Sequence, residues 1–433
     1  MCSAAREPDR RRRPVGSLRR LRALSAAATA VISVILGACE KKVRQAPAPP
    51  AAVNSGLDEP PAPPQATVDA PPFAAITTGR DHACGITQSG TLYCWGQNDL
   101  GQLGDGTTTS SDLPVAVAGG RTWQSVAAGA GHTCAVTIDG ETYCWGSSGA
   151  GQLGNDTVGS RAEPARVGKL PPLSTLTAGD AHTCGLAPDG ALFCWGANRH
   201  GELGRGTDSA TGRPDPVPTA LLFRSVVARY HRTCAITVDG ELFCWGQEDP
   251  GVHAGAETPC SDPGDADARC SLRPARLLDS LRFTAIAPGE RHSCAITQQG
   301  TTLCWGLASD GRVGIGPRDD TGPVGPTPVA GGERYTHIIT GADFSCALAA
   351  DGVAQCWGSN AEGQLATGGG TDATSPTPAA SGLHLSMLSA GDAYVCGLTT
   401  DHRAMCWGSN ASGQLGSGSK RRTFTPAAVL FAK

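Results

Sequence analysis

The chain has 433 residues, of which 58 are Gly and 31 are Pro, and only 5% are aromatic. So many helix-breaking residues exclude a largely helical protein. The formal net charge of −4 argues against a nucleic-acid partner, because Lys/Arg contacts to phosphate dominate that kind of binding.

Residues 1–39 are predicted to be a signal peptide. Eight Arg residues precede an apolar run from Ala23 to Ala38, which is short for a membrane-spanning helix. The run ends in Leu36-Gly37-Ala38-Cys39, which resembles the bacterial lipoprotein signal. The resemblance implies that Cys39 is lipidated and becomes the new N-terminus. An uncleaved anchor helix is the alternative.

Residues 40–72 are rich in Ala and Pro and offer almost nothing to bury, so they are expected to form a semi-extended spacer. The leader carries eight Arg and two acidic residues. Its removal leaves 27 basic and 37 acidic residues and a formal charge of −10. This balance again argues against nucleic acid.

The rest of the chain repeats. Cys-Trp-Gly occurs seven times, with Trp at positions 95, 145, 195, 245, 305, 357 and 407, a period typical of repeat architectures. Each copy contains a short strand of small residues, then two strands joined by a three-residue loop such as Ile138-Asp139-Gly140, then a Pro-bearing edge strand. The pattern predicts four strands per repeat.

Paired cysteines lie ten residues apart across each predicted hairpin. Opposed Cα atoms in an antiparallel ladder are about 4.5–5.5 Å apart, within the range that a disulfide requires. We predict the disulfides Cys84–Cys94, Cys134–Cys144, Cys184–Cys194, Cys234–Cys244, Cys260–Cys270, Cys294–Cys304, Cys346–Cys356 and Cys396–Cys406. Zinc sites are the alternative, but two Cys per repeat do not complete four-coordination. Disulfides indicate an oxidising compartment.

The segment from Trp95 to Gly104 reads W-G-x-N-x-x-G-Q-L-G, and Trp407 to Gly416 repeats it. With the V-x-A-G-x-x-H-x-C-A pattern that follows, it resembles the regulator of chromosome condensation repeat over residues 73–431. The resemblance implies an all-β, closed seven-bladed β-propeller of four-stranded blades over residues 73–433. Because the first copy lacks a Pro-bearing strand and the last has a surplus one, we expect the C-terminal strand, residues 424–430, to complete the first blade.

Five repeats carry a His just before the first Cys of the hairpin, and Phe344 and Tyr394 stand there in the last two. These histidines are His82, His132, His182, His231 and His292. Because the positions are spread around the ring and aromatic residues replace them, we interpret them as structural. The Gly-Gln-Leu-Gly turns are interpreted as corners between blades. Since the sequence contains no nucleophile elbow, P-loop or His/Glu metal motif, we predict no enzyme, cofactor or metal.

The fourth repeat departs most from the pattern. Arg229 replaces a Gly in the segment that also contains Tyr230 and Arg232, and an insertion occupies about residues 248–275. The insertion carries Asp262, Asp265 and Asp267 between its two Cys, without the Gly and terminal Glu of a Ca²⁺ loop. These six residues are candidates for partner binding on a protruding loop; drift in a solvent-exposed loop is the alternative.

The sequence therefore favours a non-enzymatic scaffold of the bacterial envelope, exported and anchored by its lipid alone. The outer membrane is preferred to the inner one. We expect a monomer that binds a protein or polysaccharide through its loops and does not bind nucleic acid. Guanine nucleotide exchange, which the family resemblance implies, and an envelope hydrolase or lyase are the alternatives.

Overall fold

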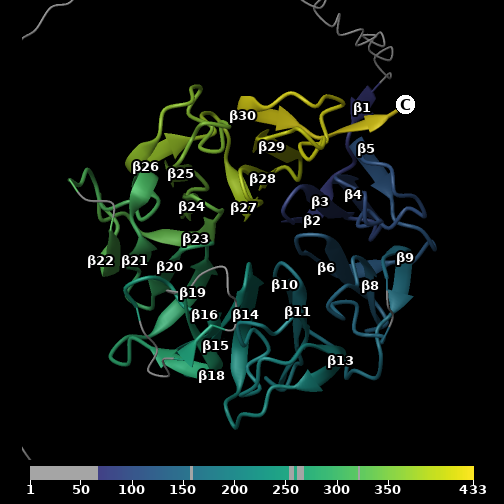
Figure 1. The fold of residues 1–433 in the computed structure, drawn as a ribbon. Helices are drawn as coiled ribbons and strands as arrows, with labels where there is room; N and C mark the ends of the chain where they lie inside the picture. The colour runs from purple at the N-terminus through teal and green to yellow at the C-terminus, as the bar shows by residue number, and fades with distance from the viewer. Residues whose placement is uncertain (1–66, 157–158, 253–257, 261–267, 320–321) are drawn as a thin grey trace, which may run out of the picture. The chain divides into compact units, whose positions relative to one another are not determined.

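The computed structural model describes residues 67–156, 159–252, 258–260, 268–319 and 322–433. The predicted signal peptide with Cys39, and most of the predicted spacer, lie outside the described residues. Apart from one two-stranded sheet, the described strands form seven antiparallel sheets that stand as blades around a central axis (Figure 1). The all-β, seven-bladed propeller is therefore confirmed.

Each blade uses four strands that follow one another in the sequence, from the innermost strand to the outer edge. The first four blades contain β2 (Phe73–Thr78), β3 (His82–Thr87), β4 (Leu92–Gly96), β5 (Ser111–Ala116); β6 (Trp123–Ala128), β7 (His132–Thr137), β8 (Thr142–Gly146), β9 (Arg161–Arg166); β10 (Thr175–Ala178), β11 (His182–Leu186), β12 (Leu192–Gly196), β13 (Thr211–Pro216); and β14 (Phe223–Arg229), β15 (Arg232–Thr237), β16 (Leu242–Gln247), β18 (Arg269–Leu277). The last three contain β19 (Phe283–Pro288), β20 (His292–Thr297), β21 (Thr302–Leu307), β22 (Pro323–Pro328); β23 (Tyr335–Thr340), β24 (Phe344–Ala349), β25 (Ala354–Gly358), β26 (Ala373–Ala379); and β27 (Leu385–Ala390), β28 (Tyr394–Thr399), β29 (Ala404–Gly408), β30 (Thr423–Ala428).

The hairpin between the second and third strands fixes the register of every blade. Gly140 closes one such loop with a φ of 80°, a conformation that costs glycine little. In the seventh blade His402 adopts the same conformation, with a φ of 66°. This register places Cys134 opposite Cys144, with Cα atoms 4.1 Å apart. All eight disulfides of the structure coincide with the predicted cysteine pairs.

The C-terminal strand closes the ring, but by a different pairing from the one expected. The predicted closing segment forms β30, the outer strand of the seventh blade, and the first blade is complete without it. Instead β31 (Leu430–Ala432) pairs with β1 (Thr67–Asp69) in a separate two-stranded sheet (Figure 1). Phe431 then packs against Phe73 and Tyr93 of the first blade. The described fold therefore begins inside the predicted spacer, at β1.

In six of the seven blades a buried Trp on the third strand bonds the preceding blade; Trp357 of the sixth blade is buried without such a bond. Trp145 donates from Nε1 to the carbonyl of Gln102 at 2.9 Å, and Trp95 makes the same bond to Gln414 across the seam between the first and seventh blades. Gln102 and Gln414 belong to Gly-Gln-Leu-Gly turns, which confirms that these turns are structural corners. The seam is therefore bonded like the other junctions.

The fourth blade alone among the described sheets has a fifth strand, because the insertion adds β17 (Thr258–Pro259) beside β18. The single described helical element is the 3₁₀ turn η1 (Ser309–Gly311). In the described part of the chain no helix has the length and apolar character needed to cross a membrane.

Candidate functional site

The irregular features of the molecule share one end of the ring. Strand direction alternates along each blade, so the turn after the first strand and the connection after the third strand emerge at the same end. We call this end the insertion face, because the insertion of the fourth blade follows its third strand, β16. Its inner turns, which surround the axis, are residues 79–81, 129–131, 179–181, 230–231, 289–291, 341–343 and 391–393.

Charged side chains meet at the axis on this face. Arg229, at the end of β14, donates from Nη2 to the carbonyl of Gly391 at 2.9 Å, which links the fourth blade to the seventh. Arg80 of the first blade pairs with Asp180 at 2.9 Å and with Asp392 at 3.3 Å. Tyr230, only 6% exposed, lies beneath the guanidinium of Arg229. We call Arg80, Asp180, Arg229, Tyr230 and Asp392 the axial cluster.

Acidic groups outnumber basic ones around this cluster. Asp81, Glu290 and Asp343 add to its two aspartates, and Arg291 is the third arginine. Burial and the neighbouring carboxylates raise the pKa of Glu290, and burial raises that of Asp392 although Arg229 and Arg80 oppose the shift. The axial end of the insertion face therefore attracts cations more strongly than anions.

Behind Arg229 the inner strands enclose a cavity of about 330 Å³. Its lining comes from β14, β19, β23 and β27 and is mostly small or apolar, for example Val227, Ile286 and Leu388. The carboxylates of the axial cluster are not among its lining residues. The cavity thus lacks the pair of acids that a glycoside hydrolase would place over its substrate.

The structure separates the three fourth-repeat candidates of the inner turn. Arg229 and Tyr230 lie at the axis, as described above. Arg232 is instead buried between the fourth and fifth blades, where it forms an ion pair with Asp249 and donates to Ser293 Oγ at 3.1 Å. Arg232 is therefore a structural residue, and its assignment to partner binding is wrong because its side chain is only 4% exposed.

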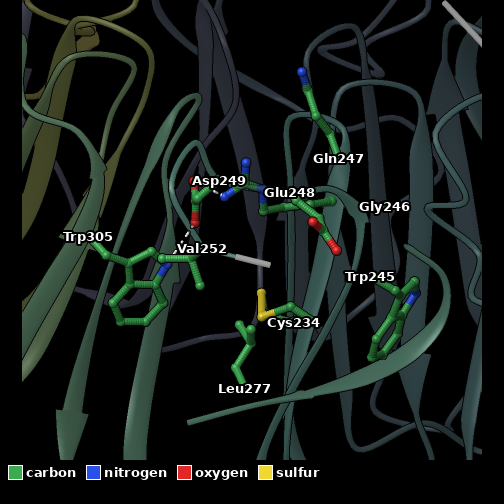
Figure 2. Close-up of a pocket in the computed structure, with 11 residues that line it drawn as sticks. Cys234, Trp245, Gly246, Gln247, Glu248, Asp249, Val252, Leu277 and Trp305 are labelled. Carbon is green, nitrogen blue, oxygen red and sulfur yellow. Dashed lines mark hydrogen bonds and ion pairs between the residues drawn. A yellow bond between two sulfur atoms is a disulfide. The ribbon is translucent and has the colours of Figure 1, made fainter. Parts of the chain in front are cut away.

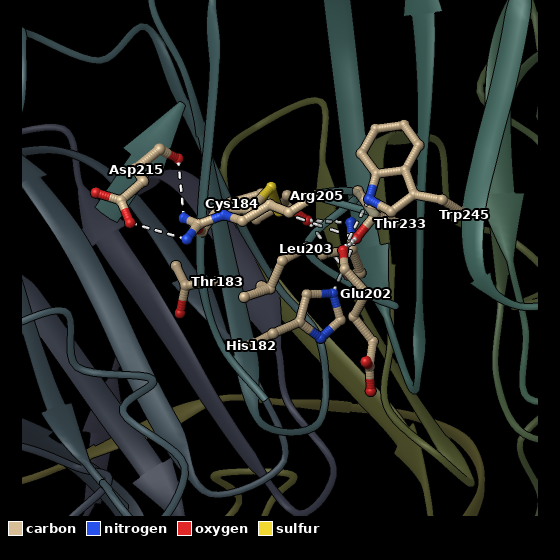
Figure 3. The surroundings of a disulfide bond; sticks show 12 residues. His182, Thr183, Cys184, Glu202, Leu203, Arg205, Asp215, Thr233 and Trp245 are labelled. Atoms are coloured by element: carbon tan, nitrogen blue, oxygen red, sulfur yellow. Dashed lines mark hydrogen bonds and ion pairs between the residues drawn. A yellow bond between two sulfur atoms is a disulfide. The ribbon is translucent and has the colours of Figure 1, made fainter. Parts of the chain in front are cut away.

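Asp249 compensates for the missing Gly-Gln-Leu-Gly turn of the fourth blade. One of its carboxylate oxygens, Oδ2, accepts from Trp305 Nε1 at 2.9 Å (Figure 2). The same oxygen accepts from Ser293 Oγ at 2.6 Å. At the junction between the third and fourth blades a backbone carbonyl is the acceptor instead. The carbonyl of Glu202 accepts from Trp245 Nε1 and from Thr233 Oγ1 (Figure 3). Asp249 is not among the residues predicted from the sequence, although the loss of that turn indicates that Trp305 needs another acceptor.

Four of the grouped histidines bond the next blade, which confirms their structural role. His82, His132 and His182 reach a Thr, and His292 reaches Ser345, all at 2.9–3.0 Å. Burial lowers the pKa of His182 to about 4 and that of His132 to about 3. His231 does not belong to this group. In the strand ladder Arg232 lies opposite Gly246, just as His182 lies opposite Gly196 in the third blade. Arg232 therefore occupies the position of the other histidines, and His231 comes one residue before it.

The insertion itself is described only in part. Cys260 and Cys270 join in a disulfide beside β17 and β18. Asp262, Asp265 and Asp267 lie outside the described residues.

Comparison with known families gives one consistent match. A model of the regulator of chromosome condensation (RCC1) repeat matches residues 89–136, 139–186 and 189–229. A second model of the same repeat matches residues 73–102, 123–152, 174–202, 336–364 and 388–414.

Relatives share only part of this chain. The ultraviolet-B receptor UVR8 of Arabidopsis thaliana is 30% identical over 99 residues, which are 23% of this chain and 22% of the receptor. The secretion-regulating guanine nucleotide exchange factor of Bos taurus is 37% identical over 108 residues, 23% of each chain. The chain thus matches less than a quarter of the length of either relative.

Two solved structures have the same fold. Yeast RCC1 (Prp20), solved bound to Kap60, superposes with a TM-score of 0.63 at 22% identity, covering 74% of this chain and 78% of that one. Human WBSCR16 superposes with a TM-score of 0.66 at 18% identity, covering 78% and 93%. At these identities the likeness is one of fold.

Proposed function

We propose, from the premise that the chain belongs to the regulator of chromosome condensation (RCC1) repeat family, that its propeller is a protein-binding platform and not an enzyme. The observation that carries the proposal is the placement of its departures from the repeat. The axial cluster and the insertion of the fourth blade lie on the insertion face, whereas the hairpin loops of the opposite face keep the closing Gly of the repeat in all blades but the seventh, where His402 replaces it. Function concentrates on loops that a rigid scaffold holds.

The charges of this face favour a basic partner. Five carboxylates and three guanidinium groups surround the axis, and the guanidinium of Arg312 pairs with one of these carboxylates, Asp343. Acidic groups therefore still outnumber basic ones, and a patch of one sign attracts a partner of the other. Among the described residues no Trp, Tyr or Phe is counted as an exposed large hydrophobic side chain, so we find no aromatic platform on which a sugar ring could stack. A protein partner is therefore proposed ahead of a polysaccharide.

The proposed setting is the bacterial envelope. It rests on the lipoprotein-like sequence that ends at Cys39 and on the eight disulfides, which suit an oxidising compartment. We propose that the protein is an exported monomer held by its lipid, in the outer membrane in preference to the inner one. If so, Cys39→Ser abolishes incorporation of labelled fatty acid, whereas Cys2→Ser does not. Equal labelling of both variants would overturn the lipid anchor.

Guanine nucleotide exchange remains the second candidate, because a relative with that printed activity is 37% identical over 108 residues. Exchange requires a cytosolic GTPase, which an exported propeller would not meet. The enzymatic alternative also loses support at the axis, because Asp180 and Asp392 are both paired with Arg80.

Capture of partners by matched charge variants tests the proposal. The triple variant E290Q/D343N/D392N removes three charges from the insertion face. The control D139N/D189N/D239N removes three from exposed hairpin loops of the opposite face. All proteins are immobilised as full chains and exposed to envelope extract at low and high salt.

We expect the same salt-sensitive proteins on wild type and control and a loss of at least about tenfold on the triple variant. A second variant that lacks residues 256–269 and carries Cys270→Ser tests the insertion. If the triple variant retains every captured protein, the insertion face is not the binding surface. If no protein is captured in larger amounts on the wild type than on the empty matrix, the proposal of a protein-binding platform is wrong.

A further inference from the structure

Three potential metal ligands converge where the third and fourth blades meet on the insertion face. His200 and Glu202 lie in the connection that follows β12, and His231 lies in the inner turn that follows β14. His200 Nδ1 is 3.1 Å from Glu202 Oε1, and His231 Nδ1 is 4.0 Å from the same oxygen. The two imidazole rings stack with centroids 4.7 Å apart, and one ligand atom from each of the three residues lies within 4.8 Å of the others.

Glu202 departs from its equivalents in a way that matters chemically. At the corresponding corners Gln102, Gln152, Gln364 and Gln414 each use Oε1 to accept the backbone N–H two residues earlier, at 2.9–3.0 Å. Glu202 keeps this bond through Oε2, which accepts from His200 N at 2.8 Å. The second carboxylate oxygen of Glu202 therefore carries negative charge and accepts hydrogen bonds, whereas the glutamines of the other corners have an NH₂ donor at this position. Figure 3 shows this carboxylate pointing away from Trp245, which bonds the backbone carbonyl of the same residue.

The two histidines are also exceptions to the repeat. Leu100 and Ala150 occupy the position of His200 in the first two blades, and Gly131 occupies that of His231 in the second. Three residues that differ from the repeat therefore lie together at the junction between the third and fourth blades. Two imidazole nitrogens and one carboxylate oxygen form a ligand set that binds Zn²⁺ with a further position open for water or a partner. Mg²⁺ and Ca²⁺ prefer oxygen ligands alone.

We propose that His200, Glu202 and His231 bind a single zinc-like divalent cation between the third and fourth blades. Glu202 and His200 are buried and held by the corner, whereas His231 is 43% exposed. His231 can therefore rotate to bring Nδ1 to a metal–nitrogen distance. Its other nitrogen, Nε2, lies 3.8 Å from Asp180 Oδ2. This carboxylate would orient the ring from behind, as outer-shell acids do for metal-bound imidazoles. The proposal does not depend on the protein-binding function.

A purely structural contact is the competing explanation, because polar pairs join equivalent positions at other junctions. Gln414 Nε2 lies 3.3 Å from Asp81 Oδ1, and Arg312 is paired with Asp343. Each of those pairs offers a single carboxylate and no imidazole, so neither supplies the ligand set of a zinc site. The Glu202–His231 pair, in contrast, is joined by a second imidazole from His200.

Zinc binding by the untagged, oxidised full chain, stripped with EDTA and kept in detergent, tests the site. Isothermal titration with ZnCl₂ gives the stoichiometry and the Kd, and Co²⁺ substitution gives a visible spectrum that reports four-coordination. Three variants copy residues of other repeats: Glu202→Gln, His200→Ala and His231→Gly. His384→Ala, an exposed histidine away from the junction, is the control.

We expect one zinc per chain for wild type and control, and an affinity at least about tenfold weaker in each of the three variants. The metal-free melting temperature of Glu202→Gln should equal that of metal-free wild type, because glutamine preserves the bond from His200 N. Absence of stoichiometric binding at zinc well above the protein concentration would overturn the proposal. Equal binding by wild type and all three variants would overturn it too, and would leave the Glu202–His231 contact as a structural pair.

Discussion

At the scale of single residues, the junction between the fourth and fifth blades shows how one substitution requires another. Arg232 stands where four other blades place a neutral His and two place Phe344 or Tyr394, so a charge enters the interior. Asp249 neutralises that charge and at the same time accepts from Trp305 and Ser293. Both side chains are about 5% exposed or less. A charge buried to this degree is tolerated only when it is paired.

Replacing Asp249 by Ala should therefore destabilise the protein strongly. The variant leaves the guanidinium of Arg232 without its counter-ion and removes an acceptor from Trp305, so we expect a loss of about 3–5 kcal/mol in the free energy of unfolding. Urea unfolding with the disulfides intact measures it. Glu362→Ala removes a carboxylate that pairs with Arg422 at the surface and should leave the midpoint unchanged. If the two substitutions lower the free energy of unfolding equally, the ion pair between Arg232 and Asp249 does not stabilise the interior as argued.

The buried histidines predict how stability depends on pH. Burial lowers the pKa of His82 and His182 to about 4 and of His132 and His292 to about 3, from a usual value of 6.5. Below pH 6.5 these histidines are protonated in the unfolded chain but stay neutral in the folded one. The free energy of unfolding therefore falls as the pH falls towards 4. Each such group contributes about 1.4 kcal/mol per pH unit at most.

His132→Phe isolates one of these groups, since Phe344 occupies the equivalent position in the sixth blade. We expect the slope of the free energy of unfolding between pH 6 and pH 4.5 to decrease by about one proton. His384→Phe changes an exposed residue and should keep the wild-type slope. An unchanged slope in His132→Phe would mean that this imidazole is protonated in the folded protein.

At the scale of elements, the hairpin of each blade is closed by a disulfide in the middle of the ladder. Six of these seven disulfides have both sulfurs buried, and in the fourth blade Cys244 is partly exposed. The insertion disulfide, Cys260–Cys270, is also partly exposed through Cys260. Exchange with a thiol requires direct access to sulfur. The two disulfides of the fourth blade are therefore the accessible ones.

Mild reduction of the native protein should accordingly act on the fourth blade first. We expect a short pulse of dithiothreitol followed by alkylation to label Cys260, Cys270, Cys234 and Cys244 before the other cysteines, as read by peptide mass spectrometry. Labelling after denaturation without reductant should find no thiol among the 16 paired cysteines. Uniform labelling of all eight pairs in the native pulse would contradict the difference in access.

At the scale of the whole molecule, two contacts between distant segments complete the ring. The β1–β31 sheet joins the two ends of the described fold, and Phe431 anchors it on Phe73 and Tyr93. Arg229 spans the axis from the fourth blade to the seventh. In a closed ring every blade packs against a blade on each side.

Phe431→Ala should loosen this closure. The ring of Phe431 is partly buried, so we expect a loss of about 1–2 kcal/mol in the free energy of unfolding, together with faster proteolysis near both ends of the propeller. Val238→Ala truncates a side chain that is 59% exposed and serves as the control. If Phe431→Ala unfolds at the wild-type midpoint, the β1–β31 sheet does not contribute to closure.

The amino-acid sequence by itself determined the features that depend on near neighbours. The number of blades, the hairpin register and the cysteine pairing follow from a ten-residue spacing that recurs seven times, because a short antiparallel loop allows only one partner for each residue. Only the tertiary structure decided the features that depend on ring closure. The bond from Arg229 to Gly391, the pairing of β31 with β1 and the meeting of His200 with His231 join different blades. The repeat pattern carries no information about such contacts, because each of them involves at least one residue that departs from the repeat or lies outside it.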